Sequence, residues 1–275
     1  MLVTLNEVLK DAQAGGYAVG LFNTTDTDML EAVISAAEEL RSPVIIGTAE
    51  ILLPYGELQL LGSAIVEAAK RASVPVVVHY DHGLTEERCR EALSLGFSSI
   101  MFDGSAGPVE DNIKRTRAMV EYAHSLGASV EGEIGHVGQA TDSASERESM
   151  YTTPEEAIAF VEATGVDALA VAIGTAHGDY KEKPRLDIEA LKKIRASLDT
   201  PLVLHGGSGL SDDDFRNTIA GGIAKINIFT DLCNAGVRAV KASNSPYLQM
   251  RNEKVAAIKE EVMKKMKLFG SVGRV

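Results

Sequence analysis

Residues 74–83 read VPVVVHYDHG, an apolar run that ends in a cluster of polar residues. A strand that is apolar throughout, rather than at alternate residues, is typical of a parallel sheet covered on both faces. Similar runs recur between Tyr17 and Ala224 at intervals of about 30 residues, the length of a strand with its crossover helix. The other runs are YAVGLFN (17–23), PVIIG (43–47), SSIMFD (98–103), ASVEGE (128–133), DALAVAIG (167–174), PLVLHG (201–206) and AKINIF (224–229).

Amphipathic segments with apolar residues at helical spacing lie between these runs, for example residues 27–41 and 154–165. Several of these segments are followed by a glycine that we expect to form a left-handed helix cap. These glycines are Gly96, Gly127, Gly165 and Gly221. The alternation of strands and helices therefore predicts an α/β fold with a parallel sheet.

Eight strand–helix units fit a (β/α)8 TIM barrel. Residues 4–14 are then an extra N-terminal helix that closes the bottom, and residues 246–268 form a C-terminal helical tail outside the barrel. An open, doubly wound sheet is the alternative, but it usually carries a Gly-rich phosphate loop after its first strand. Residues 22–28, FNTTDTD, are not such a loop. No linker or charge run divides the chain, so we expect one domain over residues 1–275.

Composition and charge exclude several classes of protein. The chain has 275 residues, of which 45% are hydrophobic and 24% charged, as in an ordinary globular protein. A net charge of −12, with no basic cluster, argues against a nucleic-acid partner. There is no signal-peptide pattern and no apolar run of the ~20 residues that a membrane span requires. Cys89 and Cys233 lie far apart, which suits a reducing compartment, so we expect a soluble, cytoplasmic protein.

Three histidines at the ends of three different predicted strands each precede a glycine: His82, His177 and His205. In a barrel the active site lies at the carboxyl ends of the strands, and a following glycine lets the backbone approach a ligand closely. A single histidine there is as often a core residue, but three together favour a metal site. Three neutral imidazoles and an open position are the ligand set of catalytic Zn²⁺, although other divalent metals also bind imidazole.

Carboxylates follow the same strands. Asp81 directly precedes His82, and we interpret it as an acid/base beside the metal rather than as a further ligand. Asp103 and Glu133 could bind a second metal position or orient the histidines. Glu131 and Glu133 fall on one face of their strand, so spacing alone does not distinguish them.

Two segments near the end of the predicted barrel have the features of a phosphate site. HGGSGL (205–210) precedes a predicted helix, and INIFTD (226–231) opens another, so backbone N–H groups and Ser208 are available to an anion. Loops after strands seven and eight are the usual phosphate site of this fold. Residues 134–153 have no periodicity, and a loop of that length after the fifth strand is interpreted as a lid.

The remaining histidines receive simpler interpretations. We expect His79, within a strand, to be a core residue and His124, within a helix, to be structural or on the surface. His136 either contacts the site from the lid or has no role there.

The motifs HYDHG, GTAHG, HGGSG and INIFTD, in this order, resemble those of the class II, metal-dependent ketose-phosphate aldolases, closest to the tagatose-bisphosphate and fructose-bisphosphate branch. The resemblance implies zinc bound by the three histidines, Asp81 as catalytic acid/base, and Asp103 and Glu133 at an alternative or second metal position. It also implies a dihydroxyacetone phosphate site, together with a monovalent cation near Gly178 and the HGGS turn. The residues that match this substrate site are Gly178, Gly206, Gly207, Ser208, Asn227, Ile228, Phe229 and Thr230.

Two segments depart from the family pattern. The lid lacks the family's paired acidic motif, so its protonating carboxylate is unassigned among Asp142, Glu146 and Glu148. The segment SNSPYLQM (243–250) lacks the arginine that binds the distal phosphate from a neighbouring subunit, and Arg251 is shifted from that place. We therefore expect that the aldehyde half need not be a phosphate ester. The resemblance separately implies a homo-oligomer, a dimer or tetramer.

The implied reaction is reversible cleavage of a ketose 1-phosphate or bisphosphate to dihydroxyacetone phosphate and an aldehyde, through a metal-stabilised enediolate. A Schiff base on Lys225 is the other aldolase chemistry, and the three histidines make it unnecessary. Two further hypotheses are kept. One is a different metal-dependent barrel enzyme, such as a hydrolase, and the other is a non-catalytic partner of an aldolase.

Overall fold

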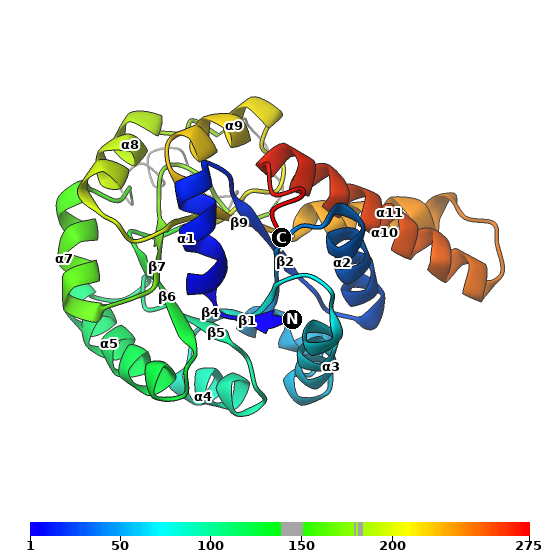
Figure 1. Cartoon of the computed structure of the whole chain (residues 1–275), viewed down its shortest axis with the longest axis horizontal. Helices are drawn as coiled ribbons and strands as arrows, with labels where there is room; N and C mark the ends of the chain where they lie inside the picture. Colours follow the sequence, from blue (N-terminus) through cyan, green and yellow to red (C-terminus); the bar gives the residue numbers. More distant parts are fainter. Residues whose placement is uncertain (139–150, 179, 181–183) are drawn as a thin grey trace.

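The computed structural model describes residues 1–138, 151–178, 180 and 184–275. Its sheet is a closed ring of eight parallel strands surrounded by helices (Figure 1), which confirms the TIM barrel and excludes the open sheet. The ring runs in the order β4-β3-β2-β9-β8-β7-β6-β5, and pairing of β4 with β5 closes it. The strands are β2 (Val19–Asn23), β3 (Val44–Ala49), β4 (Val76–Gly83), β5 (Ser99–Phe102), β6 (Ser129–Ile134), β7 (Ala168–Val171), β8 (Leu202–Leu204) and β9 (Ile223–Ile228).

Helices follow the strands and cover the outside of the ring (Figure 1). They are α2 (Thr27–Leu40), α3 (Leu58–Arg71), α4 (Glu86–Ser94), α5 (Val109–Ser125), α7 (Pro154–Thr164), α8 (Ile188–Ser197), α9 (Asp212–Ala220) and α10 (Thr230–Ala242), with a 3-10 turn η1 (Glu50–Tyr55) after β3. Side-chain caps fix several helix starts, as local sequence predicts. Asp26 accepts a hydrogen bond from the backbone N–H of Met29, and Thr153 forms a capping box with Glu156.

The extra N-terminal helix is α1 (Leu5–Gly15), which crosses one opening of the barrel (Figure 1). Its buried Leu5 and Leu9 pack with Val77 and Val203, which point into the barrel from β4 and β8. This apolar plug closes the amino-terminal end of the ring. Access to the interior is therefore from the end where the strands terminate.

The predicted tail is α11 (Tyr247–Phe269), which packs against α2, α9 and α10. Its inner face buries Ile258, Val262 and Phe269 in the layer between sheet and helices. The α10–α11 pair projects beyond the ring (Figure 1).

Two local features differ from the sequence-based expectation. Gly96, Gly127 and Gly165 have positive φ, but Gly221 is right-handed at φ −77°. The second glycine of the pair, Gly222, takes the left-handed conformation instead, at φ +110°. A short strand, β1 (Leu2–Val3), pairs with β4 and was not expected.

Within the described part of the chain, no helix is both long enough and apolar enough to cross a membrane.

Candidate active site

A cavity of about 300 Å³ opens at the carboxyl ends of the strands. The predicted site residues line it, except His205 and Glu133, which are fully buried beside it. The lining consists of Asn23, Ala49, Ile51, Leu52, Asp81, His82, Leu84, Asp103, His136, Val137, Ala176, His177, Gly178, Gly206, Gly207, Ser208, Asn227, Ile228, Phe229 and Thr230. The structure therefore brings segments from all eight strand ends of the barrel to one place.

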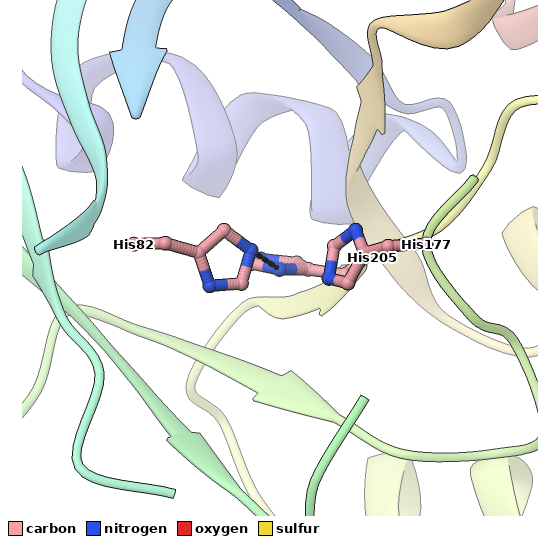
Figure 2. Close-up of side chains that lie close together, drawn as sticks. All are labelled: His82, His177 and His205. Carbon is pink, nitrogen blue, oxygen red and sulfur yellow. Dashed lines mark hydrogen bonds between the residues drawn. The ribbon is translucent and has the colours of Figure 1, made fainter. Parts of the chain in front are cut away.

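The three histidines meet within this site (Figure 2). His82 ends β4, His177 follows β7 and His205 follows β8. The ring centre of His82 lies 4.9 Å from that of His177 and 4.5 Å from that of His205. One nitrogen of each ring lies within 4.8 Å of the others, so the three can serve one metal ion.

Carboxylates fix the orientation of two of these rings. Nδ1 of His82 donates to Asp103 (2.7 Å), and Nε2 of His205 donates to Glu131 (2.8 Å). The opposite nitrogens, Nε2 of His82 and Nδ1 of His205, then face each other at 2.8 Å. A histidine whose second nitrogen is held by a carboxylate is the usual form of a metal ligand.

The charges of the site also suit a bound cation. Burial lowers the pKa of His177 to about 3 and lowers that of His205, so both rings are neutral donors near pH 7. Burial opposes the charging of His82, but Asp81 and Asp103 outweigh it and raise the pKa of His82 to about 9. The site thus stabilises one positive charge among neutral nitrogen donors, which fits a divalent metal.

A bent backbone allows neighbouring residues to reach the same cavity. In a regular strand Asp81 and His82 would point to opposite faces. His82 has φ +44°, a left-handed value that is uncommon outside glycine, and the pairing of β4 with β5 shifts register between Tyr80 and Gly83. Both side chains consequently line the cavity, and such local strain is typical of functional sites.

Asp81 is buried and held by two amides from neighbouring strands. Asn23 donates to one carboxylate oxygen (2.7 Å) and Asn227 to the other (3.0 Å). Burial opposes ionisation, but the positive charges of His82 and Lys225 hold the pKa of Asp81 well below its usual range. Asn23 was missed in the sequence, although a polar residue at the end of an apolar strand was a usable signal.

The structure distinguishes the two glutamates that spacing could not. Glu131 is fully buried outside the cavity lining and binds Lys225 (2.8 Å) as well as His205. Glu133 lies on the cavity side, within reach of His82 and Asp103, and accepts from the backbone N–H of Val137 (3.0 Å). Burial and the charge of Asp103 raise the pKa of Glu133 to about 8.

Lys225 is fully buried and does not line the cavity. Its ammonium group forms an ion pair with Glu131 beneath the histidines, which argues against a Schiff-base role. The pair instead stabilises the carboxylate that orients His205.

We predict that Lys225→Met lowers the free energy of unfolding by about 3–5 kcal/mol, because it leaves Glu131 as a buried charge without its cation. Urea denaturation measures this loss. Lys259→Met is the matched control, since it breaks a partly exposed pair with Glu39 that is worth about 0–1 kcal/mol. Equal destabilisation by both substitutions would contradict the role given to Lys225.

The predicted phosphate loops come together, with one correction. Ser208 does not face the start of α9, where Ser211 and Asp214 already form a capping box. Its hydroxyl instead accepts from the backbone N–H groups of Phe229 (3.2 Å) and Asp231 (3.3 Å) at the start of α10. The helix start that opens onto the cavity is therefore that of α10, whereas Ser211 and Asp214 cap the start of α9.

Gly206 allows the loops after β7 and β8 to touch. It has φ +64°, and a Cβ atom there would lie 2.4 Å from the carbonyl oxygen of Ala176.

We predict that Gly206→Ala lowers kcat/KM by roughly 10²-fold, because displacing a substrate loop by ~1 Å has an effect of that size. Gly127→Ala is the control: its φ is +76°, but nothing lies within 4 Å of an added Cβ. A similar loss in the control would assign the effect to general backbone strain.

The other sequence-based expectations have separate outcomes. His79 is a buried core residue on Ser99, and His124 binds Asp167 near the surface. His136 lines the cavity, where its Nδ1 lies 2.9 Å from Ser105, a residue that the sequence did not single out. The three lid candidates Asp142, Glu146 and Glu148 lie outside the described residues.

The model of one protein family, described as "Fructose-bisphosphate aldolase class-II", matches residues 3–274. The chain belongs to this family. It is therefore an aldolase of class II, a lyase, as the motifs predicted.

Individual relatives cover the whole aldolase chain. It is 43% identical over 276 residues to Escherichia coli (strain K12) YdjI, described as an uncharacterized protein, covering 100% of this chain and 99% of the relative. It is 41% identical to a fructose-bisphosphate aldolase of Thermus caldophilus over 308 residues, with 100% of both chains covered.

Solved structures of aldolases have the same fold as this chain. The crystal structure of the YdjI aldolase from Escherichia coli K12 superposes with a TM-score of 0.90 at 40% identity, over 100% of this chain and 99% of that one. A putative fructose-1,6-bisphosphate aldolase from Coccidioides immitis gives a TM-score of 0.90 at 31% identity, over 98% and 97%.

Proposed function

We propose that this aldolase reversibly cleaves a ketose 1-phosphate or ketose bisphosphate to dihydroxyacetone phosphate and an aldehyde. The observation that carries the proposal is one site that brings together three convergent imidazoles, a buried carboxylate and the start of helix α10. These three groups supply what a retro-aldol reaction needs: charge stabilisation, proton transfer and a phosphate anchor. We treat residues 1–275 as a single barrel domain that carries out this reaction.

A divalent metal, Zn²⁺ in the first instance, is proposed at His82, His177 and His205. When bound, such an ion acts as a Lewis acid that stabilises the negative charge left on the ketone side when the carbon–carbon bond breaks. The donor set fits it, because two of the imidazoles are neutral and the third is held by a carboxylate. Asp103 and Glu133 complete a second group with His82 that could hold the metal in an alternative position.

Asp81 is proposed as the acid/base. In cleavage it takes the proton from the hydroxyl on the aldehyde-side carbon, and in condensation it returns that proton. Asn23 and Asn227 keep its carboxylate in place, and Asn227 also lies in the cavity wall, where it can contact the substrate.

The phosphate of dihydroxyacetone phosphate is proposed to bind between the loops after β7, β8 and β9. Gly206 and Gly207 keep the backbone free of side chains there, and Ser208 stands at the start of α10. Gly178, Ile228, Phe229 and Thr230 complete this part of the cavity wall. Backbone N–H groups and a helix start bind phosphate without a basic side chain. The monovalent cation near Gly178 and the HGGS turn stays a prediction.

The surroundings of the enzyme are also proposals. The free thiols of Cys89 and Cys233 suit a reducing compartment, so we place the protein in the cytoplasm. A homo-oligomer is proposed through the projecting α10–α11 pair, whose Tyr247 and Leu248 are exposed. Sedimentation of the purified protein distinguishes a dimer or tetramer from a monomer.

The direct test is condensation. Purified protein is incubated with dihydroxyacetone phosphate and a panel of aldehydes, before and after removal of metal, and the ketose phosphate is quantified by mass spectrometry. We expect product that disappears with the metal and returns when Zn²⁺ is added. No product with any aldehyde from metal-loaded protein would contradict the proposal and would favour the hydrolase or the non-catalytic partner.

A further inference from the structure

We infer that the aldehyde-binding side of the cavity selects an uncharged aldehyde by means of an apolar wall formed by Ala49, Ile51, Leu52 and Leu84. This inference rests on the proposed function and adds the substrate class to it. It concerns the part of the cavity that faces away from the phosphate loops.

The strand order places this wall. Ala49, Ile51 and Leu52 lie at the end of β3 and in η1, and Leu84 directly follows β4. In the closed ring β4-β3-β2-β9-β8-β7-β6-β5, strand β3 lies four positions from β7 and β4 lies four positions from β8, so each pair is on opposite sides of the barrel. The phosphate loops follow β7, β8 and β9, so a substrate anchored there extends toward the wall.

The wall is exposed where a ligand would cover it. Ile51 is 71% exposed and Leu84 is 51% exposed, although both line the cavity. Large apolar side chains left open at the rim of a binding cavity are typical of ligand-binding grooves. An aldehyde chain placed over them would remove apolar surface from water.

Glu50 links the two segments that form the wall and occupies backbone N–H groups beside it. Its carboxylate accepts from the backbone N–H of Leu84 (2.9 Å) and of Thr85 (3.2 Å), and from the Thr85 hydroxyl (3.1 Å). These bonds tie η1 to the start of α4. The backbone N–H groups of Leu84 and Thr85, directly before that helix, are therefore already satisfied by a carboxylate.

The charges of the cavity disfavour a second phosphate. Among the residues that the structure describes, no lysine or arginine lines the cavity, whereas Asp81 and Asp103 do. Arg251, the cation next in sequence to the segment that lacks the family arginine, binds Asp28 (2.7 Å) and Glu31 on α2. Within the described cavity wall, a phosphate dianion on the aldehyde would thus meet carboxylates and no lysine or arginine.

The reaction with an uncharged aldehyde balances without another reagent. Dihydroxyacetone phosphate loses one proton from its hydroxymethyl carbon, and this carbon forms a bond with the aldehyde carbon. The aldehyde oxygen receives a proton from Asp81 and becomes a hydroxyl group, and the proton released from the hydroxymethyl carbon replaces it on Asp81 by way of solvent. The product is a ketose 1-phosphate that contains every atom of the two substrates.

The test compares two aldehydes that differ only in the phosphate. We measure kcat/KM for condensation of dihydroxyacetone phosphate with glyceraldehyde and with glyceraldehyde 3-phosphate. We expect the uncharged aldehyde to be favoured at least tenfold. A preference for glyceraldehyde 3-phosphate would overturn the inference.

A variant tests the wall itself. Leu84→Arg adds a cation at an exposed position, so we expect it to shift the ratio of the two kcat/KM values toward the phosphorylated aldehyde by at least tenfold. Leu60→Arg, at a 75% exposed position on α3 outside the cavity, is the matched control and should leave the ratio unchanged. A ratio that Leu84→Arg does not move, or that Leu60→Arg moves equally, would overturn the inference.

The two proposals fail in different ways. If the protein exchanges the hydroxymethyl protons of dihydroxyacetone phosphate with solvent but prefers the phosphorylated aldehyde, the proposed function stands and the apolar-wall inference fails. If there is neither exchange nor condensation, the proposed function itself fails and the inference fails with it.

Discussion

Asp81→Asn is expected to lower kcat for condensation and cleavage by roughly 10²–10⁴-fold, the usual contribution of a positioned acid/base. The substitution conserves shape, and one of the amides of Asn23 or Asn227 can turn to keep a hydrogen bond. What it removes is the group that accepts and returns the proton.

Metal content, measured by mass spectrometry on the same sample, separates this role from that of a ligand. We expect the Asp81→Asn protein to retain its metal. The Asp81 carboxylate forms a cluster with His79 and Glu131, and it is not part of the cluster of three convergent histidines. A metal-free variant would show that Asp81 is a ligand. A variant with wild-type kcat would show that another group transfers the proton.

His205→Ala is expected to remove both the metal and the activity. His205 presents Nδ1 toward His82 while Glu131 holds its Nε2, so its loss removes one donor of the metal site and one of the partners of Glu131, which keeps Lys225. Loss of an outer partner alone typically weakens metal binding about 10–100-fold, so loss of the ligand should cost at least about 10²-fold.

His124→Ala is the control for that substitution. His124 lies on α5, binds Asp167 near the surface and does not line the cavity, so metal content and activity should be unchanged. Full activity in the His205→Ala protein would rule out the metal site described above.

The fold could be predicted because several independent signals agreed. Continuously apolar strands, helical periodicity and a regular interval all indicated strand–helix units, and FNTTDTD excluded a Rossmann-type loop. Boundaries shifted by a few residues, because hydrogen bonding at an element's end depends on tertiary contacts. The handedness at Gly221 and Gly222 is such a case, since either glycine of the pair can supply the turn.

The residues of the site could be predicted, but their hydrogen-bond and ion-pair partners could not. The histidines at strand ends could be identified as site residues because a barrel gathers those ends at one opening. The choice between Glu131 and Glu133 could not be predicted, because alternation places both on one face and only their different partners in the folded barrel distinguish them. The sequence already argued against a Schiff-base role for Lys225, but only its burial against Glu131 shows its supporting position.

Backbone geometry explains the other differences. The sequence does not reveal that His82 adopts a left-handed conformation, yet this bend lets Asp81 and His82 share one cavity. Similarly, Ser208 was linked to the helix that follows it in sequence, whereas packing of adjacent strands brings it to the start of α10. Both features depend on contacts between segments that are distant along the chain.

Proton exchange on dihydroxyacetone phosphate tests the central claim most directly, because it needs no knowledge of the aldehyde. The purified protein is incubated with dihydroxyacetone phosphate in heavy water, and loss of the hydroxymethyl proton signal is followed by NMR with and without a chelator. We predict exchange that the chelator abolishes and that added Zn²⁺ restores. Metal-loaded protein that catalyses no exchange would contradict the account.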